Sequence, residues 1–382
     1  MNIGMFTDSY RPYTSGVVRS LETFTRELEA MGHRVFIFAP DYGNPVREPN
    51  VFRYFSVPAP TNRHFYLAVP LSWRTGLTLR RLNLDVVHVH APFLLGRLGL
   101  RAARRQGLPV VFTYHTMYDQ YTHYVPLLGS SLRSWVGRVA RDFANRCDTV
   151  IAPTGSIKEL LEQGGIRSSI RVVPTGVDPE EFIRCDPGWA RQAFNLEPDR
   201  PVLTTVGRLG VEKNLEFLVR AISHLDAPVV LLMVGDGPMR GRLESLAREL
   251  GVAGRVIFTG QLQRPQLGSV LKASHLFVFS SHTDTQGVVL LEAHAAGVPI
   301  VAVDAPGARD MVTPGVNGLL TGPNEAHFAT AIRSLLEDPR LHSEYSRAAR
   351  EHAQRLSARE CARMLVTVYQ DVMARTRSSD TS

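Results

Sequence analysis

The stretch "HLFVFSSHTDTQGVVLLEAHAAGVPIVAVDAPG", residues 275–307, decides the fold, because it places one apolar helix between two apolar strands. "HLFVFSS" and "PIVAVDAPG" are short apolar runs that pass into polar or glycine-containing loops, which predicts buried strands. Between them, Gly287 opens a segment, 288–296, that predicts a helix. Strand, helix and strand in this order predict a parallel sheet.

The same alternation extends along the chain in both directions. A helix is predicted over 15–34, because Val17, Leu21, Phe24 and Leu28 follow helical spacing. Further helices are predicted over 214–225, 239–250 and roughly 358–375. The other predicted strands are "NIGMFT" (2–7), "RVFIFAP" (34–40), "LDVVHVHAP" (84–92), "LPVVFTYHT" (108–116), "DTVIAPT" (148–154), "PVLTTVGR" (201–208), "APVVLLMVGDG" (227–237), "RVIFTG" (255–260) and "NGLLTGP" (317–323).

The alternation pauses at "VVPTGVDPEEF", residues 172–182, where two prolines and a glycine predict a hinge. We therefore expect an α/β protein with two doubly wound parallel-sheet, Rossmann-like domains facing across a cleft. The boundaries are a first domain over 1–175, a second domain over 176–357 and a final helix over 358–382. In such sheets ligands bind beyond the carboxyl ends of the strands, so the informative residues follow each strand.

Composition narrows the class of protein. Three widely spaced cysteines without a CxxC pair suit a reducing compartment, and the opening "MNIGMFTDSY" predicts a strand rather than a signal peptide. We therefore expect a cytoplasmic protein. The net charge of +7 is uneven: residues 1–175 hold 21 Lys and Arg against 12 Asp and Glu. This favours an anionic partner such as a membrane surface, although a general preference for arginine is an equal explanation.

Polar and aromatic residues follow the predicted strands of the first half. Gly16 opens a helix whose amides favour an anion, and His90 and His115 each come at a strand end. The segment "YHTMYDQYTHY", 114–124, holds two histidines and four tyrosines, which suits a binding wall better than a core. The candidate acceptor-binding residues are Asp8, Tyr13, His90, Tyr118, Tyr121 and His123.

The second half predicts a sugar-nucleotide site. Arg208 and Lys213 stand on a strand-to-helix turn and suit a diphosphate. Asp284 and Glu292 flank the start of the helix at Gly287, and carboxylates accept hydrogen bonds from sugar hydroxyls. The remaining candidate donor-binding residues are Gly207, Gln286 and Val288.

We expect neither a metal ion nor another cofactor. No two aspartates are spaced as DxD, and His88 and His90 have no third ligand at suitable spacing. The glycine fingerprint GxGxxG is missing, which argues against a nicotinamide oxidoreductase. A sugar-binding transport protein would need an export signal, and a glycogen-type phosphorylase would need a longer chain.

Taken together, "GVVRS", "GRLGVEKN", "VGDGP", "TDTQGVVLLEA", "AAGVPIVAVDAPG" and "GVNGLL" resemble the retaining glycosyltransferases of the large family four, which have the GT-B fold. The resemblance spans nearly the whole chain. It implies that Glu292 binds the nucleotide ribose and that Asp284, where the family has Glu, binds donor-sugar hydroxyls. It also implies that Arg208 and Lys213 bind the diphosphate with Gly16 close by. His115 would contact the transferred sugar, and the final helix would cross back to the first domain.

Residues 114–124 resemble, more narrowly, the diacylglycerol glucosyltransferases of that family. With the basic first half, this implies transfer of a hexose, best glucose, from a nucleotide sugar such as UDP-glucose to a lipid acceptor. The acceptor would be diacylglycerol at the anionic inner face of the cell membrane, with no nucleic-acid partner. The alternatives are a GDP-mannose-dependent mannosyltransferase, a transferase to a soluble acceptor, and a nucleotide- or sugar-binding protein without transferase activity.

Overall fold

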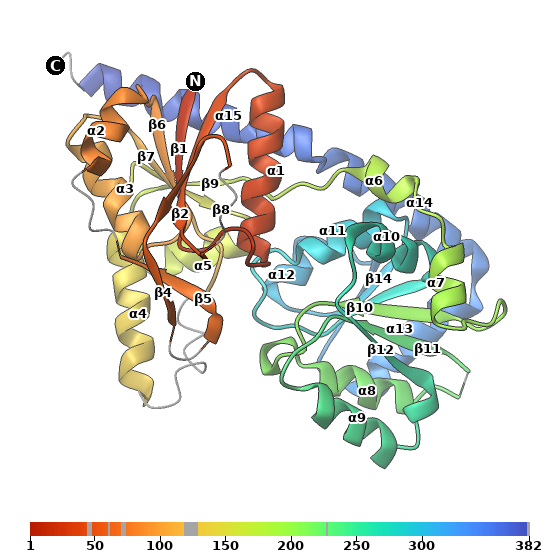
Figure 1. The fold of residues 1–382 in the computed structure, drawn as a ribbon. Coiled ribbons are helices and arrows are strands. Elements are labelled where there is room, and N and C mark those ends of the chain that lie inside the picture. The colour runs from red at the N-terminus through yellow and green to blue at the C-terminus, as the bar shows by residue number, and fades with distance from the viewer. Residues whose placement is uncertain (44–47, 60–61, 70–73, 118–128, 227, 380–382) are drawn as a thin grey trace. The chain divides into compact units, whose positions relative to one another are not determined.

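The computed structural model describes residues 1–43, 48–59, 62–69, 74–117, 129–226 and 228–379. The chain forms two compact units (Figure 1). The first unit combines Met1–Thr175 with Ala358–Ser382, and the second unit is Gly176–Ser357. Tyr114, His115, Thr116 and Met117 of the segment 114–124 are described, whereas the candidates Tyr118, Tyr121 and His123 lie outside the described residues.

The first unit is built on a parallel sheet of seven strands in the order β3-β2-β1-β6-β7-β8-β9. A separate antiparallel pair, β4 and β5, lies outside it. The bounds are β1 (Asn2–Phe6), β2 (Arg34–Pro40), β3 (Val51–Tyr54), β4 (Ser56–Ala59), β5 (Asn62–Ala68), β6 (Val86–Val89), β7 (Val110–Thr113), β8 (Thr149–Ala152) and β9 (Ser169–Val172).

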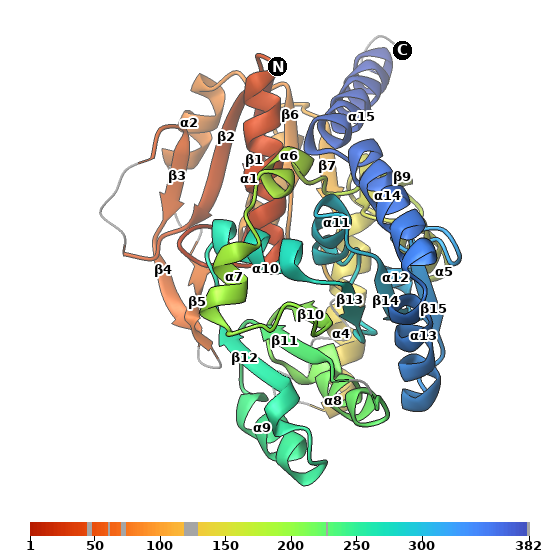
Figure 2. The same cartoon turned by 90° about the vertical axis from the view of Figure 1, so that its right-hand side faces the viewer.

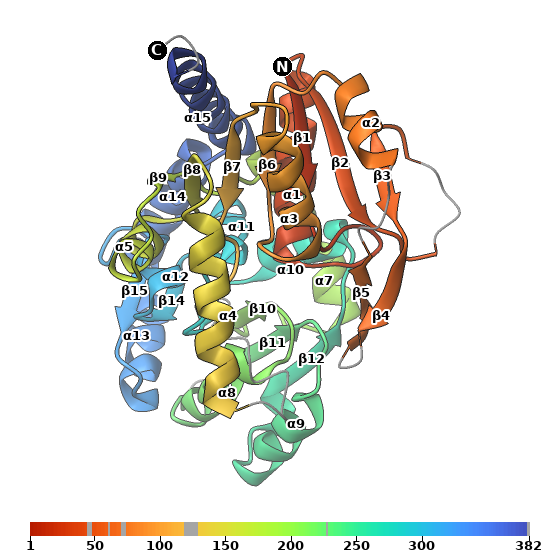
Figure 3. The ribbon, with the colours of Figure 1, turned by 90° about the vertical axis from the view of Figure 1, so that its left-hand side faces the viewer.

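Helices cover both faces of this sheet, and α3 and α4 stand in front of it in Figure 3. They are α1 (Gly16–Ala30), α2 (Arg74–Arg81), α3 (Leu94–Arg104), α4 (Gly129–Ala144), α5 (Gly155–Gln163) and α15 (Ala358–Ser379). The last helix of the chain, α15, packs beside α1. Tyr369 of α15 is fully buried, and its hydroxyl is 2.7 Å from His88 Nδ1 on β6. This buried hydrogen bond ties the end of the chain to the first sheet.

The second unit has a parallel sheet of six strands in the order β12-β11-β10-β13-β14-β15. Alternate residues of its strands enter two cores: Val230, Leu232 and Val234 face one, and Leu231 and Met233 face the other. The strands are β10 (Val202–Val206), β11 (Val230–Val234), β12 (Val256–Gly260), β13 (Leu276–Phe279), β14 (Ile300–Val303) and β15 (Gly318–Thr321).

Two groups of helices sandwich this sheet (Figure 2). One face carries α6 (Pro179–Ile183), α7 (Gly188–Ala193), α10 (Arg264–Ala273) and α11 (Val288–Ala295). The other face carries α8 (Leu215–Ser223), α9 (Arg240–Glu249) and α13 (Glu325–Glu337). The remaining helices of this unit are α12 (Pro306–Arg309), α14 (Pro339–Arg355), and the short 3-10 helices η2 (Val211–Lys213) and η3 (Ala253–Arg255).

The strands and the parallel arrangement predicted from the sequence are confirmed, with element ends shifted by a few residues. Strand order reverses between β1 and β6 in the first unit and between β10 and β13 in the second. Doubly wound sheets bind ligands at such switch points, because the connections on either side diverge there. Each unit is therefore expected to place its functional residues in the loops after these two strands.

Candidate functional site

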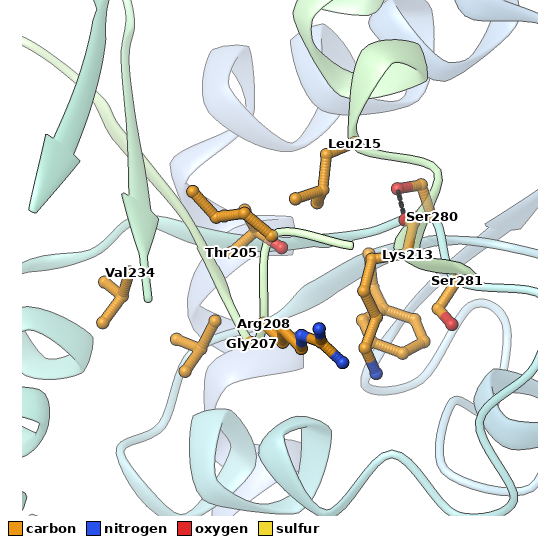
Figure 4. Close-up of a pocket in the computed structure, with 11 residues that line it drawn as sticks. Thr205, Gly207, Arg208, Lys213, Leu215, Val234, Ser280 and Ser281 are labelled. Carbon is orange, nitrogen blue, oxygen red and sulfur yellow. Dashed lines mark hydrogen bonds between the residues drawn. The ribbon is translucent and has the colours of Figure 1, made fainter. Parts of the chain in front are cut away.

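A pocket opens at the switch point of the second sheet, between the loops that follow β10 and β13. It is lined by Thr205, Val206, Gly207, Arg208, Leu209, Lys213, Leu215, Val234, Phe279, Ser280 and Ser281. Figure 4 shows the nitrogen ends of Arg208 and Lys213 on the same side of this pocket. Two long cations beside a strand-end turn form a surface suited to a doubly charged anion.

The turn that carries Arg208 depends on glycines. Gly235, at the end of β11, has a φ of +129°, and a Cβ there would lie 2.0 Å from the carbonyl oxygen of Gly207. The amide of Leu209 also donates to the carbonyl of Asp236 at 3.0 Å. The "GDG" turn, 235–237, therefore supports the Arg208 turn by direct backbone packing, which only a residue without a side chain permits.

Lys213 is held in place from the next loop. Ser280 Oγ donates to the carbonyls of Lys213 and Asn214 at 2.9 and 3.0 Å, and Ser281 Oγ donates to Glu212 O at 3.3 Å. Asn214 adopts a left-handed φ of 50°, which turns the chain from η2 into α8. Both serines follow β13 directly, so the rule that strand ends carry the site could have identified them from the sequence.

The structure pairs two residues to which the sequence assigns separate roles. Lys213 Nζ donates to both carboxylate oxygens of Asp284, at 2.6 and 2.8 Å. The two side chains are only 21% and 17% exposed. A short, two-oxygen ion pair shielded from water is much stronger than an exposed one. The candidate diphosphate cation and the candidate sugar carboxylate therefore form one electrostatic unit.

The N-terminus of α11 lies directly after this pair. Gly287 caps the helix with a left-handed φ of 60° and no side-chain hydrogen bond to the first turn, which begins at Val288. Gln286 precedes it and is buried. Close packing shapes the loop, because a Cβ on Gly307 would meet the carbonyl oxygen of Asp284 at 2.2 Å. The helix thus presents backbone amides at the same strand-end edge as Lys213.

Glu292 lies inside α11 and is 1% exposed. Its Oε1 accepts a hydrogen bond from Arg264 Nη1 of α10 at 2.7 Å. The sequence offers sugar hydroxyls as partners for this buried acid and does not identify Arg264. No sequence pattern links the two, because Arg264 is the first residue of a different helix, 28 positions earlier.

Three histidines stack in the first unit. His88 on β6 and His90 directly after it face the same side, as their spacing predicts, with ring centroids 4.1 Å apart. His90 Nδ1 and His115 Nε2 share a hydrogen bond of 2.9 Å. Burial lowers the pKa of His88 to about 3 and that of His115 to about 4. Both rings are therefore neutral near pH 7. The two nitrogens of His88 already have partners inside the unit, the hydroxyls of Tyr369 and Thr113, each at 2.7 Å.

The other first-unit candidates surround the start of α1 and α3. Asp8 Oδ1 accepts from the amide of Leu95 at 2.9 Å, and burial raises the Asp8 pKa to about 6. The Tyr13 ring makes an edge contact with Phe65, with centroids 5.6 Å apart. Gly16 begins α1, and a Cβ there would meet no described atom within 4 Å. Asp8 and His90 follow β1 and β6, which form the switch point of this sheet.

The described part of the chain shows neither a metal-binding cluster nor a membrane-spanning helix. No group of three His, Cys, Asp or Glu there could hold a metal ion. Within the same residues, no helix combines the length and apolar character needed to cross a bilayer.

Comparison with known proteins identifies the family. Residues 14–181 match the model "Glycosyltransferase Family 4", and residues 190–352 match "Glycosyl transferases group 1". An alpha-monoglucosyldiacylglycerol synthase of Streptococcus pneumoniae is 31% identical over 89% of this chain and 79% of its own length. A GDP-mannose-dependent alpha-mannosyltransferase of Corynebacterium glutamicum is 30% identical over 98% of this chain and 90% of its own length.

Solved structures show the fold. The sucrose-phosphate synthase of Thermosynechococcus elongatus matches with a TM-score of 0.80 at 22% identity, covering 98% of this chain and 99% of that one. Anabaena HepE, solved in complex with UDP-glucose, matches with a TM-score of 0.75 at 23% identity, covering 99% and 100%. With two parallel Rossmann-like sheets of the GT-B type and relatives of this identity along most of its length, the chain belongs to glycosyltransferase family 4.

Proposed function

We propose that this glycosyltransferase moves a hexose, best glucose, from a nucleoside-diphosphate sugar to a lipid acceptor such as diacylglycerol at an anionic membrane surface. Binding of the nucleotide-sugar donor is supported by the pocket at the switch point of the second sheet, where Arg208 and Lys213 lie side by side. Such cations can stabilise the charge that develops on a departing diphosphate.

The proposed division of labour gives each candidate residue one part of the donor or acceptor. Arg208 and Lys213 hold the diphosphate, with Gly207 and the amides at Val288 beside it. Asp284 accepts bonds from hydroxyls of the hexose, and Glu292 accepts from the ribose. A carboxylate accepts on two oxygens, so each acid can hold two neighbouring hydroxyls. His115, Asp8 and His90 of the first unit are proposed contacts for the transferred sugar and the acceptor.

In the proposed reaction, the bond from the anomeric carbon to the diphosphate oxygen breaks and a bond to the acceptor oxygen forms on the same face. The acceptor proton passes to the departing phosphate oxygen, and the anomeric configuration is retained. We propose that no metal ion takes part, since Arg208 and Lys213 supply positive charge where other transferases use a bound cation.

Charge and exposed apolar side chains support the lipid acceptor. The first unit carries 25 Lys and Arg against 15 Asp and Glu, whereas the second carries 18 against 21. On α4, Trp135 is 54% exposed and shares the helix with the exposed Arg138 and Arg141. Aromatic and cationic side chains together favour the interface of anionic membranes. Two of the relatives, including the one from Streptococcus pneumoniae, are named as synthases of a glucosylated diacylglycerol.

A GDP-mannose-dependent reaction is the second candidate, because relatives of that name are 30–31% identical to this chain. One screen distinguishes the two. UDP-glucose and GDP-mannose are each incubated with the protein, with and without diacylglycerol vesicles, and nucleoside diphosphate release and glycolipid are measured. We expect release from UDP-glucose that depends on the vesicles. If nucleoside diphosphate is released from GDP-mannose and not from UDP-glucose, the second candidate is favoured. If the rate of release is the same with and without vesicles, the proposal of a lipid acceptor is wrong.

A further inference from the structure

One guanidinium joins three helices around the candidate ribose carboxylate. Arg264, at the start of α10, donates from Nε to Glu181 Oε1 at 2.7 Å and from Nη2 to Glu181 Oε2 at 2.5 Å. Its remaining nitrogen, Nη1, donates to Glu292 Oε1 at 2.7 Å. The guanidinium carbon also lies 5.0 Å from the ring centroid of Phe182. All three nitrogens of Arg264 therefore have a carboxylate partner.

These contacts fix the direction in which Arg264 meets Glu292. A planar guanidinium that makes a two-bond pair with Glu181 cannot rotate without breaking both bonds. The aromatic ring of Phe182, itself buried, supports the same plane from one side. Glu181 and Phe182 both belong to α6, so a five-residue helix holds the cation in place.

Glu292 needs such a partner. Its side chain is 1% exposed, whereas those of Arg264 and Glu181 are about one-third exposed. A carboxylate buried to this degree without a cation tends to take up a proton, and a protonated acid is a poorer acceptor for two hydroxyls. The bond from Nη1 occupies Oε1 and thereby fixes the plane of the carboxylate.

We propose that Arg264 is a positioning residue for nucleotide binding: it keeps the Glu292 carboxylate ionised and in one orientation, and Glu181 and Phe182 keep Arg264 in place. The proposal rests on the proposed role of Glu292 at the ribose. Arg264 itself need not touch the nucleotide. Its effect is therefore specific to the ribose hydroxyls, whereas loss of Arg208 affects the diphosphate.

The test measures dissociation constants of UDP and 2′,3′-dideoxy-UDP, or of GDP and 2′,3′-dideoxy-GDP if the protein prefers guanine, by titration calorimetry. The variants are Arg264→Gln, Arg264→Lys, Glu181→Gln and Glu292→Gln. Arg242→Gln is the matched control, because Arg242 pairs with Glu216 and Glu249 on the surface of the same unit. Thermal unfolding of each variant checks that it is folded. If Arg264→Gln does not fold, Glu181→Gln takes its place in the comparison.

We expect Arg264→Gln to weaken binding of the ribonucleotide about tenfold and to leave the 2′,3′-dideoxy compound nearly unchanged, as Glu292→Gln does. Glu181→Gln should act in the same direction more weakly, and Arg264→Lys should keep part of the preference.

If Arg264→Gln lowers the affinity for both nucleotides equally, Arg264 has only a general structural role. If Arg264→Gln binds both nucleotides as the parent does, Arg264 has no role in binding. Either result overturns the inference. If Glu292→Gln keeps the full preference for ribose, the role of Glu292 is wrong and the inference fails with it. If the parent protein binds neither UDP nor GDP, the proposed function itself fails.

Discussion

Replacing Asp284 by asparagine should separate sugar transfer from nucleotide binding. The substitution keeps the shape of the side chain and removes its charge. A neutral amide is a poorer acceptor for hexose hydroxyls than a carboxylate. It also releases Lys213, whose ammonium contacts both Asp284 oxygens at 2.6 and 2.8 Å. Transfer should therefore fall while the affinity for the free nucleoside diphosphate is kept or improved.

The burial of the pair sets the size of these effects. Side chains about one-fifth exposed lie between surface pairs, which contribute about 0.2–1 kcal/mol, and buried pairs, whose disruption costs about 3–5 kcal/mol. We take roughly 1–3 kcal/mol for this pair. Releasing Lys213 to the diphosphate can tighten binding by at most this amount, which is about 5- to 140-fold at about 1.4 kcal/mol per factor of ten. Losing the contact to the sugar should lower turnover about 10²–10³-fold.

The assay combines initial rates with calorimetry of the free nucleoside diphosphate. Glu292→Gln should do the reverse of Asp284→Asn and weaken nucleotide binding itself. Asp284→Glu introduces the acid that the resemblance implies at this position, and it should be tolerated or should raise turnover. Full activity in Asp284→Asn, or a loss of nucleotide affinity as large as that of Glu292→Gln, would refute the separate roles of the two acids.

A double-mutant cycle isolates the pair itself. Lys213→Met, Asp284→Asn and the double variant should show a coupling of about 1–3 kcal/mol in the free energy of unfolding in urea. The same cycle on Arg240 and Glu244, which are both 41% exposed, is the matched control and should give less than about 0.5 kcal/mol. Equal couplings in the two cycles would mean that burial does not strengthen the Lys213 pair.

Four further outcomes follow from the site. Arg208→Ala should lower turnover roughly 10²–10³-fold, and activity within a few-fold of the parent would remove Arg208 from the diphosphate site. Transfer should survive excess EDTA; complete loss that Mg²⁺ or Mn²⁺ reverses would contradict a metal-independent reaction. Vesicles rich in anionic lipid should bind the protein better than neutral ones, and salt should weaken this binding, whereas equal and salt-insensitive binding would favour a soluble acceptor. Acid should destabilise the first unit: His88 and His115 have folded pKa values of about 3 and about 4, below the ordinary 6.5, so the unfolded chain binds more protons as the pH falls. Burial lowers the pKa of His90 well below its ordinary value as well. From pH 7 to pH 5 each of these three histidines costs about 2 kcal/mol and Asp8, with a pKa of about 6, returns about 1, so urea unfolding of the first unit should show a net loss of roughly 4–5 kcal/mol; unchanged stability would mean that water reaches the histidines.

The sequence predicts the strands and helices whose buried residues follow a regular pattern along the chain. Strands such as 230–234 and 300–303 are apolar throughout because both faces of a doubly wound sheet are covered. The residues after β10 and β13 could also be chosen as candidates from the sequence, because parallel strands bring their carboxyl ends to one edge of the sheet. The weakly apolar strands β3, β4, β5 and β9 were not predicted, and β9 alternates exposed with buried or half-buried residues.

Contacts between distant side chains are what the sequence does not predict. Asp284 and Lys213 are both correctly placed after strands, but their ion pair spans 71 positions. Arg264 has no pattern that marks it, because its partners Glu181 and Glu292 lie on two other helices. Tyr369 reaches His88 across 281 positions. Such pairs depend on how helices pack on the sheet, and the spacing of apolar residues carries no record of which polar side chains meet.

The most direct test of the donor site is a crystal structure of the protein with UDP, or with GDP if that binds more tightly, in metal-free buffer. We expect the diphosphate within hydrogen-bond distance of Arg208 and Lys213, and the ribose hydroxyls on the Glu292 carboxylate with the Arg264 bond intact. A nucleotide bound elsewhere, or a diphosphate that binds only through an added metal ion and leaves Arg208 and Lys213 without contact, would contradict it.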